Sequence, residues 1–417
     1  MSLAVLRRPR SATRALGALL AAVTGSACAG RSRPSWTGSA LARPAREGAT
    51  RLAPGVVHRT LAWTGAAPWR AEVLEVDLAC GATVAAHKAG GAAVGRAGTL
   101  ALVREAARTR DDVAGGANAD FFSFRPAGVP VTAHVGGSRV VTGPAADRPV
   151  FALDAHGRPW FGTLAVSGWA TAAGRGDTLA LAGWNRAAPG ALALYDAAYG
   201  ARTDSIGGRL FVTLGRPDPA VTPTGIPHRV PTRRAVLAVD SGAAAPLPAD
   251  GAVLVLAADA PGSVRRRLAA LRPGADSIAL TVRLAPVVPR EAVGGHPLLL
   301  HEGAPVAGAD RAGDAGFIGR NPRTAVGLSR DRRHLLLVTV DGRRPGWSVG
   351  MSLAELTALL QGLGAWEALN LDGGGSTTLV VRAPDAAGGL RIANQPSDSA
   401  GERPVANALV VHACRRR

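Results

Sequence analysis

Aromatic side chains are scarce in this chain: Phe, Trp and Tyr make up only 4% of its 417 residues. This scarcity disfavours nucleic-acid binding, because proteins that hold single strands stack the bases on aromatic rings. The formal charge of +18 comes almost entirely from arginines, which are scattered and form no long Lys/Arg run. We therefore expect no nucleic-acid partner, although the excess charge is compatible with a general attraction to anionic substrates.

Cysteine is nearly absent, with only Cys28, Cys80 and Cys414 in the chain. None has C-x-x-C spacing and the histidines are dispersed, which argues against a zinc site. In an oxidising compartment Cys80 and Cys414 can close a disulfide between an early strand and the last one; the alternative is two separate buried thiols. No cofactor is required by the sequence, and a divalent cation is compatible with it.

Long apolar runs are also missing, apart from one near the N-terminus. Residues 1–29 combine a basic segment, the apolar "ALGALLAAV" and the small-residue "TGSACAG", which predicts a signal peptide. The apolar part is too short to span a bilayer. Ala27 to Ala29 fits a cleavage site, and lipidation of Cys28 is the alternative. We expect an exported protein that is periplasmic, secreted or a lipoprotein of the cell envelope, with no transmembrane helix.

The rest of the chain indicates a linker followed by one domain. Residues 30–50 are polar and contain proline, whereas 51–414 carry short apolar runs separated by Gly/Pro turns. Abundant glycine (53) and proline (29) suit a strand-rich fold. From these patterns we expect an α+β fold with mixed, mostly antiparallel sheets and a few packed helices.

The clearest helix signal lies at 352–363. Ser352 and Glu355 form an S-x-x-E capping box, and leucines spaced three and four residues apart fall on one helical face. Shorter helices are predicted at about 99–108 and 263–271.

The loop "NLDGGGSTTLVV" (370–381) indicates a functional site. Three consecutive glycines, Gly373, Gly374 and Gly375, let several backbone N–H groups converge on an anion, with Asp372 and Ser376 at either end. A hairpin turn is the alternative, but Asp-Gly alone would suffice for one. The loop is neither a Walker A loop nor a G-x-S-x-G elbow.

Four further segments carry polar residues where strands begin or end. Each is ambiguous by itself, because turns use the same residue types. The candidates are Asn118 and Asp120 in "NADFF", Arg323 and Thr324 in "NPRTAVG", Asp341 in "VTVDG", and Asn394, Ser397, Glu402 and Arg403 in the stretch before the last strand.

Taken in order, these motifs resemble the phosphodiester glycosidase family. The resemblance is carried by "NADFF", "GGHPLLLHEG", "NPRTAVG", "VTVDGRRPGWSVGMSLAEL", "NLDGGGSTTLVV", "NQPSD" and "ERPVANALVVH". It is densest over 290–412. One departure is Asp120, since the family usually has glycine before the two phenylalanines, and a carboxylate there puts the substrate in doubt more than the fold.

The resemblance implies hydrolysis of a sugar-1-phosphodiester in an extracytoplasmic glycan or glycoconjugate, such as an exopolysaccharide. Asp372 is then the best candidate for the carboxylate at the anomeric carbon, as nucleophile or as base on water; Asp341, Asp120 and Glu402 are rivals for a second carboxylate. The remaining candidates would bind substrate or phosphate. They are Asn118, Arg323, Thr324, Gly373, Gly374, Gly375, Ser376, Asn394, Ser397 and Arg403.

Two other functions are compatible with the same residues. One is a non-catalytic cell-envelope protein that binds phosphorylated polysaccharide, which turnover of a glycosyl-1-phosphate diester would exclude. The other is a polyanion-binding module, which predicts steep salt dependence without turnover.

Overall fold

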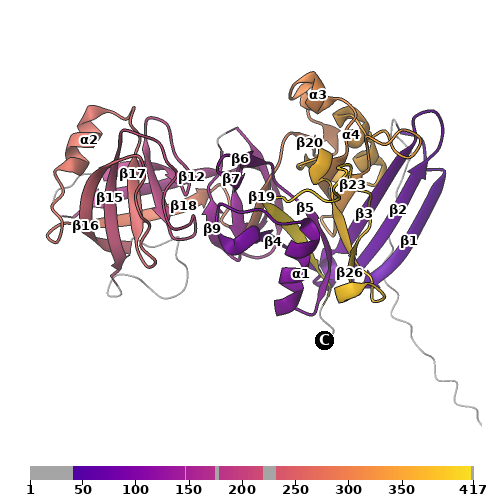
Figure 1. Ribbon diagram of the computed structural model, residues 1–417, viewed down its shortest axis with the longest axis horizontal. Helices are drawn as coiled ribbons and strands as arrows, with labels where there is room; N and C mark the ends of the chain where they lie inside the picture. Colours follow the sequence, from indigo (N-terminus) through magenta and orange to yellow (C-terminus); the bar gives the residue numbers. More distant parts are fainter. Residues whose placement is uncertain (1–40, 146, 174–177, 219–231, 415–417) are drawn as a thin grey trace, which may run out of the picture. The chain divides into compact units, whose positions relative to one another are not determined.

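Strands dominate the architecture of this protein, shown in Figure 1 as a computed structural model. The structure describes residues 41–145, 147–173, 178–218 and 232–414, and within them it has 27 strands and four α-helices. The predicted signal peptide, Cys28 and the first part of the predicted linker lie outside the described residues. Residues 46–50, at the end of that linker, lie in the first strand.

The expectation of an α+β fold is wrong, because the protein is mostly β. Short apolar runs broken by glycine and proline do not allow helices to propagate, since a helix needs several turns to repay its nucleation cost. The four helices are correspondingly short: α1 (Thr99–Thr109), α2 (Gly262–Ala269), α3 (Ala315–Ile318) and α4 (Leu353–Gly362).

The largest sheet has eight strands, all paired antiparallel. It joins the start of the chain to its C-terminal third, because β3 pairs with β23. The strands in spatial order are β1 (Arg46–Ala53), β2 (Val56–Trp63), β3 (Trp69–Asp77), β23 (His334–Val340), β22 (Arg323–Ser329), β24 (Ala365–Asn370), β20 (Leu298–His301) and β21 (Ala304–Pro305).

A five-stranded sheet packs against it face to face. Its order is β26 (Leu390–Ile392), β25 (Leu379–Arg382), β5 (Val113–Asn118), β27 (Asn407–His412) and β4 (Thr83–Lys88). Apolar side chains of both sheets form one buried cluster, as in a sandwich. α1 covers the outer face of the smaller sheet through Val103 and Ala106, and α4 packs on the larger sheet through Leu356 and Leu360.

A closed barrel is inserted in the sequence between two strands of a third sheet. That sheet consists of β11 (Pro159–Thr163), β10 (Pro149–Asp154), β19 (Pro289–Gly294), β8 (His134–Gly136) and β9 (Arg139–Thr142), and the hairpin β6 (Phe122–Phe124) and β7 (Ala127–Pro130) precedes it. The chain leaves at the end of β11 and returns at β19. The barrel strands in order are β12 (Ala165–Ala172), β13 (Thr178–Trp184), β14 (Leu192–Asp196), β17 (Ala252–Leu256), β15 (Arg209–Pro217), β16 (Thr232–Gly242) and β18 (Ser277–Ala285).

The helix with the capping box is confirmed as α4. The hydroxyl of Ser352 accepts a hydrogen bond from the Glu355 N–H at 3.2 Å, and the Glu355 carboxylate accepts one from the Ser352 N–H at 2.8 Å. The sequence therefore determined this N-terminus through contacts only three residues apart.

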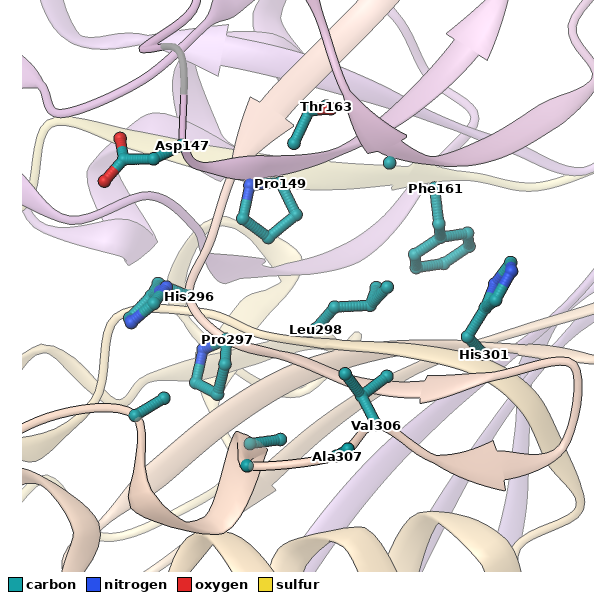
Figure 2. Close-up of a pocket in the computed structure, with 14 residues that line it drawn as sticks. Asp147, Pro149, Phe161, Thr163, His296, Pro297, Leu298, His301, Val306 and Ala307 are labelled. Atoms are coloured by element: carbon teal, nitrogen blue, oxygen red, sulfur yellow. The ribbon is translucent and has the colours of Figure 1, made fainter.

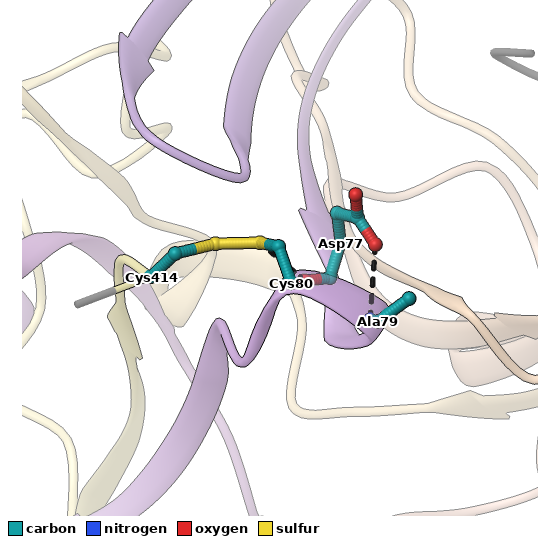
Figure 3. The surroundings of a disulfide bond; sticks show 4 residues. All are labelled: Asp77, Ala79, Cys80 and Cys414. Carbon is teal, nitrogen blue, oxygen red and sulfur yellow. Dashed lines mark hydrogen bonds between the residues drawn. A yellow bond between two sulfur atoms is a disulfide. The ribbon is translucent and has the colours of Figure 1, made fainter. Parts of the chain in front are cut away.

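Cys80 and Cys414 form a disulfide across 334 residues of chain (Figure 3). Cys80 ends a short 3-10 turn, η1 (Leu78–Cys80), whose first residues are capped by the Asp77 carboxylate accepting the Ala79 N–H at 3.0 Å. Gly55 lies alongside, where a Cβ would meet both sulfurs at 2.3 Å. The link fastens the end of β27 to the turn that follows β3.

Candidate functional site

The glycine loop that follows β24 packs closely against three neighbouring segments. Gly374 has a left-handed backbone (φ 61°) and donates its N–H to the Pro322 carbonyl at 2.9 Å. A Cβ on Gly373 would lie 2.6 Å from that same carbonyl oxygen, and one on Gly375 would lie 2.3 Å from atoms of Asp398 and Arg403. The glycines are therefore required for close packing, and the groups they meet are polar or charged.

Asn118, at the end of β5, fixes the start of this loop. Its amide nitrogen donates to the main-chain carbonyl of Asp372 at 2.7 Å. Its carbonyl oxygen accepts hydrogen bonds from the Thr324 hydroxyl at 2.9 Å and from the Thr378 N–H at 3.0 Å. Asn118 and Thr324 are both fully buried. The two predicted residues thus act together as a support for Asp372.

Asp372 lies at the mouth of the loop and is half-buried. Burial of its carboxyl group raises the pKa to about 7, while Ser376, the positive charge of Arg403 and the Gly373 N–H lower it in part. Ser376 lies near enough for this effect, but its hydroxyl makes no full hydrogen bond within the described residues. A carboxyl group that titrates near neutral pH can serve as a nucleophile or a general base.

Asp120 provides a second carboxyl group whose pKa is raised to near neutral pH. It is 1% exposed, its N–H donates to Asn407 at 2.8 Å, and its Oδ2 accepts the Thr132 N–H at 3.0 Å. Burial raises its pKa to about 7, and the negative charge of Asp372 acts in the same direction. Opposing effects come from the Thr132 N–H and Arg186. The two carboxyl groups are therefore electrostatically coupled.

Asp341 and Asn394 form a neighbouring buried group. Asp341 Oδ1 accepts hydrogen bonds from the Asn394 amide at 3.2 Å and the Gln395 N–H at 3.0 Å, and Oδ2 accepts one from the Trp347 indole at 3.2 Å. Burial raises the pKa of Asp341, which these donors oppose. Asn394 also donates to the Thr377 carbonyl at 3.1 Å, which connects this group to the end of the glycine loop.

The guanidinium group of Arg323 donates its hydrogen bonds to main-chain carbonyls of the protein. Its Nε donates to the Met351 carbonyl at 2.8 Å, and one Nη2 serves the carbonyls of Phe317 and Gly319, both at 2.6 Å. Burial, together with the nearby charge of Arg343, lowers the pKa of Arg323 to about 10. The predicted phosphate ligand is thus chiefly a brace between the start of β22 and the segments around it.

Arg343 and Arg403 bring positive charge to the loop. Arg343 Nη2 lies 3.1 Å from the position that a Cβ on Gly374 would occupy. Arg343 itself has a left-handed backbone (φ 60°), a conformation that residues other than glycine seldom adopt. Arg403 forms a two-point ion pair with Asp398, with contacts of 2.9 and 3.2 Å. Strained residues often mark functional sites.

Besides Ser376, two hydroxyl groups near these residues have no hydrogen-bond partner within the described part of the chain. The Oγ1 of Thr378 and the Oγ of Ser397 are buried without a hydrogen bond among the described residues. A buried polar atom that lacks a partner is costly, so such atoms are common where a ligand supplies the missing bond.

Glu402 lies apart from this arrangement. Its carboxylate accepts the Leu100 N–H at 3.1 Å, at the N-terminus of α1, and a Cβ on Gly98 would meet it at 2.4 Å. Burial raises its pKa, and the N–H groups of Thr99 and Leu100 oppose this shift. Glu402 therefore caps the N-terminus of α1, and it is the weakest of the four candidates for a catalytic carboxylate.

The sequence did not predict three residues that complete the surroundings, His134, Arg186 and Arg343, whereas Asn407 belongs to the polar stretch before the last strand. Asn407 accepts the Asp120 N–H and donates to His134 Nδ1 at 3.1 Å, which leaves the ring proton on Nε2. Burial lowers the pKa of His134 to about 3, so it is neutral. Arg186 comes from the barrel and donates to the carbonyls of Pro130 and Thr132. Arg343 and Asn407 lie inside motifs that the sequence shows, and these motifs could have predicted them as site residues. His134 and Arg186 lie in no such motif.

Part of the chain matches a known protein family. Residues 232–412 match the family model described as phosphodiester glycosidase. This segment belongs to the phosphodiester glycosidase family. It contains the glycine loop, Asp341, Asp372 and Arg403, and it includes the stretch 290–412 on which the sequence resemblance was densest. No match was found among curated protein sequences.

Solved structures of low sequence identity share the fold. A hypothetical protein from Synechocystis is 22% identical with a TM-score of 0.66, over 86% of this chain and 62% of that one, so the chain spans about three fifths of that relative. A protein from Burkholderia pseudomallei K96243, named as exported, is also 22% identical with a TM-score of 0.66, over 90% and 98% of the two chains. The catalytic domain of zebrafish N-acetylglucosamine-1-phosphodiester alpha-N-acetylglucosaminidase, auto-inhibited by its pro-peptide, is 16% identical over 89% and 88%, with a TM-score of 0.42 that does not establish a common fold.

The described part of the chain shows neither a metal centre nor a membrane-spanning helix. No group of three His, Cys, Asp or Glu side chains there is arranged to hold a metal ion. Likewise, no helix in it is long and apolar enough to cross a membrane.

Proposed function

We propose that this protein hydrolyses a sugar-1-phosphodiester in a glycan or glycoconjugate outside the cytoplasm. The observation that carries the proposal is the coupled pair Asp372 and Asp120, both with pKa values raised to about 7, beside a glycine loop that faces Arg343 and Arg403. A pair of carboxyl groups suits glycoside cleavage, and the cations suit a phosphate leaving group.

The reaction breaks the bond between the anomeric carbon and the phosphodiester oxygen. The water oxygen bonds to the anomeric carbon and keeps one proton as the new hydroxyl group, while the other water proton passes to the departing phosphomonoester or to the solvent. Because phosphate is already a good leaving group, strong acid assistance is less necessary than in ordinary glycosidases. The protein instead has to neutralise the departing anion and stabilise positive charge on the sugar.

Asp372 is the group best suited to act at the anomeric carbon. It is half-buried, whereas Asp120 is fully buried and its Oδ2 is held by the Thr132 N–H. As a carboxylate, Asp372 attacks the carbon or takes a proton from water. Asp120 modulates it through charge, since the two groups repel when both are ionised.

We place the phosphate of the substrate next to the glycine loop, on the side where Arg343 and Arg403 lie. Arg343, Arg403 and the Ser397 hydroxyl, which has no hydrogen bond among the residues that the structure describes, offer donors there, with Ser376 at the end of the loop. A charged donor contributes more to anion binding than a neutral one. Arg323 supports this side electrostatically, because its guanidinium and that of Arg343 lie near enough to influence one another.

The test is turnover by the purified full chain of a panel of sugar-1-phosphodiesters, monitored by release of the phosphomonoester. Hydrolysis that is lost in Asp372→Asn supports the proposal. Binding of the same diesters without any turnover across the panel would overturn it in favour of a non-catalytic phosphoglycan-binding protein. Repeating the assay in chelator shows whether a divalent cation takes part.

Export from the cytoplasm is part of the proposal. It is supported by the N-terminal signal pattern in residues 1–29 and by the name of the B. pseudomallei protein that shares the fold. Cell fractionation of the full-length chain tests it, and Cys28→Ala separates a lipoprotein from a cleaved form, because only a lipoprotein would change its membrane association.

A further inference from the structure

A pocket of about 450 Å³ lies beside β24, the strand that ends two residues before Asp372 (Figure 2). One wall comes from the third sheet, with Pro149, Phe161 and Thr163, and the other from β20 and the segment that follows it. Figure 2 shows Asp147 and His296 at one end and His301 near Phe161 at the other. The volume falls within the range of about 300–1,000 Å³ that is typical of small-molecule sites.

Hydrogen bonds tie this pocket to the candidate active site. The His296 N–H donates to the Asn370 carbonyl at 2.8 Å, and the Asn370 amide donates to the His296 carbonyl at 2.6 Å. Asn370 is the last residue of β24, two positions before Asp372. On the other side, the segment before His296 approaches the second carboxylate, since a Cβ on Gly294 would lie 2.7 Å from Asp120 Oδ2.

The pocket and the glycine loop lie on opposite flanks of β24. In the eight-stranded sheet β24 is placed between β22 and β20. The glycines lean toward β22 through Pro322, whereas Pro297 and Leu298 bring the pocket to the β20 side. A substrate centred on Asp372 therefore has one flank next to the loop and the other next to the pocket.

The two flanks differ in charge. Arg343 and Arg403 stand on the loop side, whereas none of the 14 residues that line the pocket is Arg or Lys, and Arg148 acts on the pocket only through its charge near His296. The pocket instead combines an apolar surface with a few polar groups. The apolar members are Pro149, Phe161, Pro297, Leu298 and Val306, and the polar ones are Asp147, Thr163, His296 and His301. This pattern suits an uncharged ligand with hydroxyl groups and suits a phosphate poorly.

His296 is equipped to recognise such a ligand. Its ring stacks on Phe317 with centroids 6.2 Å apart and an interplanar angle of 25°. Burial and the charge of Arg148 hold its pKa below the usual value, so the ring is neutral near pH 7. The ring already donates one hydrogen bond to the Ala312 backbone, so the other nitrogen of the neutral imidazole is an acceptor for a donor such as a sugar hydroxyl.

We infer that this pocket binds the uncharged sugar ring of the substrate, while the phosphate lies on the glycine-loop side of Asp372. The inference rests on the proposed function for the identity of the ligand. It makes the pocket the part of the site that selects the sugar, and it makes Val306, Thr163 and His296 specificity-determining residues.

The experiment separates sugar binding from turnover in the full-length protein. Methyl α-D-glucopyranoside, methyl N-acetyl-α-D-glucosaminide and inorganic phosphate serve as probes, with binding followed by ligand-observed NMR. Val306→Trp fills the pocket, and Ala307→Trp does so from the adjacent loop position, which guards against a folding defect in the first variant. Ala243→Trp, at an exposed position of the barrel, is the matched control.

We expect at least one methyl glycoside to bind, at least a tenfold loss of that binding in both pocket variants, and phosphate binding within twofold of the wild type. The control should match the wild type for every probe. Sugar binding that is unaffected by both pocket variants, or absent for both glycosides while diesters are hydrolysed, would overturn the inference. If glycosides bind in the pocket but no diester is ever turned over, the proposed function fails and the pocket assignment stands.

Discussion

The side-chain amide of Asn118 donates a hydrogen bond of 2.7 Å to the main-chain carbonyl of Asp372, across 254 residues of sequence. This contact joins the end of β5 in the smaller sheet to the loop after β24 in the larger one. The position of the candidate catalytic carboxylate therefore depends on how the two sheets of the sandwich are aligned.

Replacement of Asn118 by alanine should cost both stability and activity. The change leaves the Asp372 carbonyl, the Thr378 N–H and the Thr324 hydroxyl without their buried partner, for a total of about 3 kcal/mol. Urea denaturation measures the free energy of unfolding. Thr324→Val, which removes a single one of these bonds, is the control and should lose about 1 kcal/mol. Equal losses in both variants would contradict the model of Asn118 as the common support.

Gly375→Ala should disrupt the ion pair beside the loop. The new Cβ would lie 2.3 Å from atoms of both Asp398 and Arg403, a distance that forces one of them to move. We expect kcat/KM for a phosphodiester to fall at least tenfold. Gly207→Ala is the matched control, because nothing lies within 4 Å of its Cβ position. An unchanged kcat/KM in Gly375→Ala would show that this ion pair is not part of phosphate recognition.

Arg343→Gln should weaken binding of the anion more than it slows the chemical step. The guanidinium lies beside Gly374 and contributes positive charge where phosphate is expected. We therefore expect a rise in KM of about tenfold and a shallower dependence of KM on salt concentration, because one exposed charge is removed. Arg283→Gln, on an exposed position of the barrel strand β18, provides a charge-matched control that should leave both quantities unchanged.

The rate should rise with pH as Asp372 ionises. Since burial raises its pKa to about 7, most molecules carry the protonated form at pH 6 and the carboxylate at pH 8. The acid limb of kcat/KM should therefore have a midpoint near pH 7, well above the pKa of 3.8 of an unperturbed Asp side chain. Asp120 is coupled to Asp372, so the measured midpoint belongs to the pair. A midpoint below pH 5 would exclude the ionisation of a buried carboxyl group as the controlling step.

Asp120→Asn should make the protein more stable at alkaline pH. Because the pKa of Asp120 rises from 3.8 in the unfolded chain to about 7 in the folded one, its contribution to stability is fully present below pH 4 and is lost as pH rises to 7. Asparagine carries no charge to bury, so the variant should gain at most about 4 kcal/mol over the wild type at pH 8. At pH 4 the two proteins should unfold alike. Denaturation at both pH values tests this, and a constant difference would rule out titration of Asp120 as the cause.

Local patterns in the sequence were sufficient for much of the secondary structure. The capping box and leucine spacing predicted α4 within a residue or two, and strands at 69–78 and around the glycine loop were confirmed as β3, β24 and β25. These predictions succeeded because the interactions involved join residues a few positions apart. The fold class was wrong, since the few helices expected beside the antiparallel sheets are too short to make an α+β fold and the protein is mostly β.

The sequence alone determined that Asp372 stands at the mouth of a glycine loop and that this loop belongs to a recognisable set of motifs. Only the tertiary structure decided what surrounds it. Strand pairing brought Asn118 from β5, the barrel insertion supplied Arg186, and Glu402 was drawn to the N-terminus of α1. These contacts join residues that are tens to hundreds of positions apart, and short-range periodicity carries no information about them. Burial then set the pKa values of both carboxyl groups, and burial is a property of the folded chain as a whole.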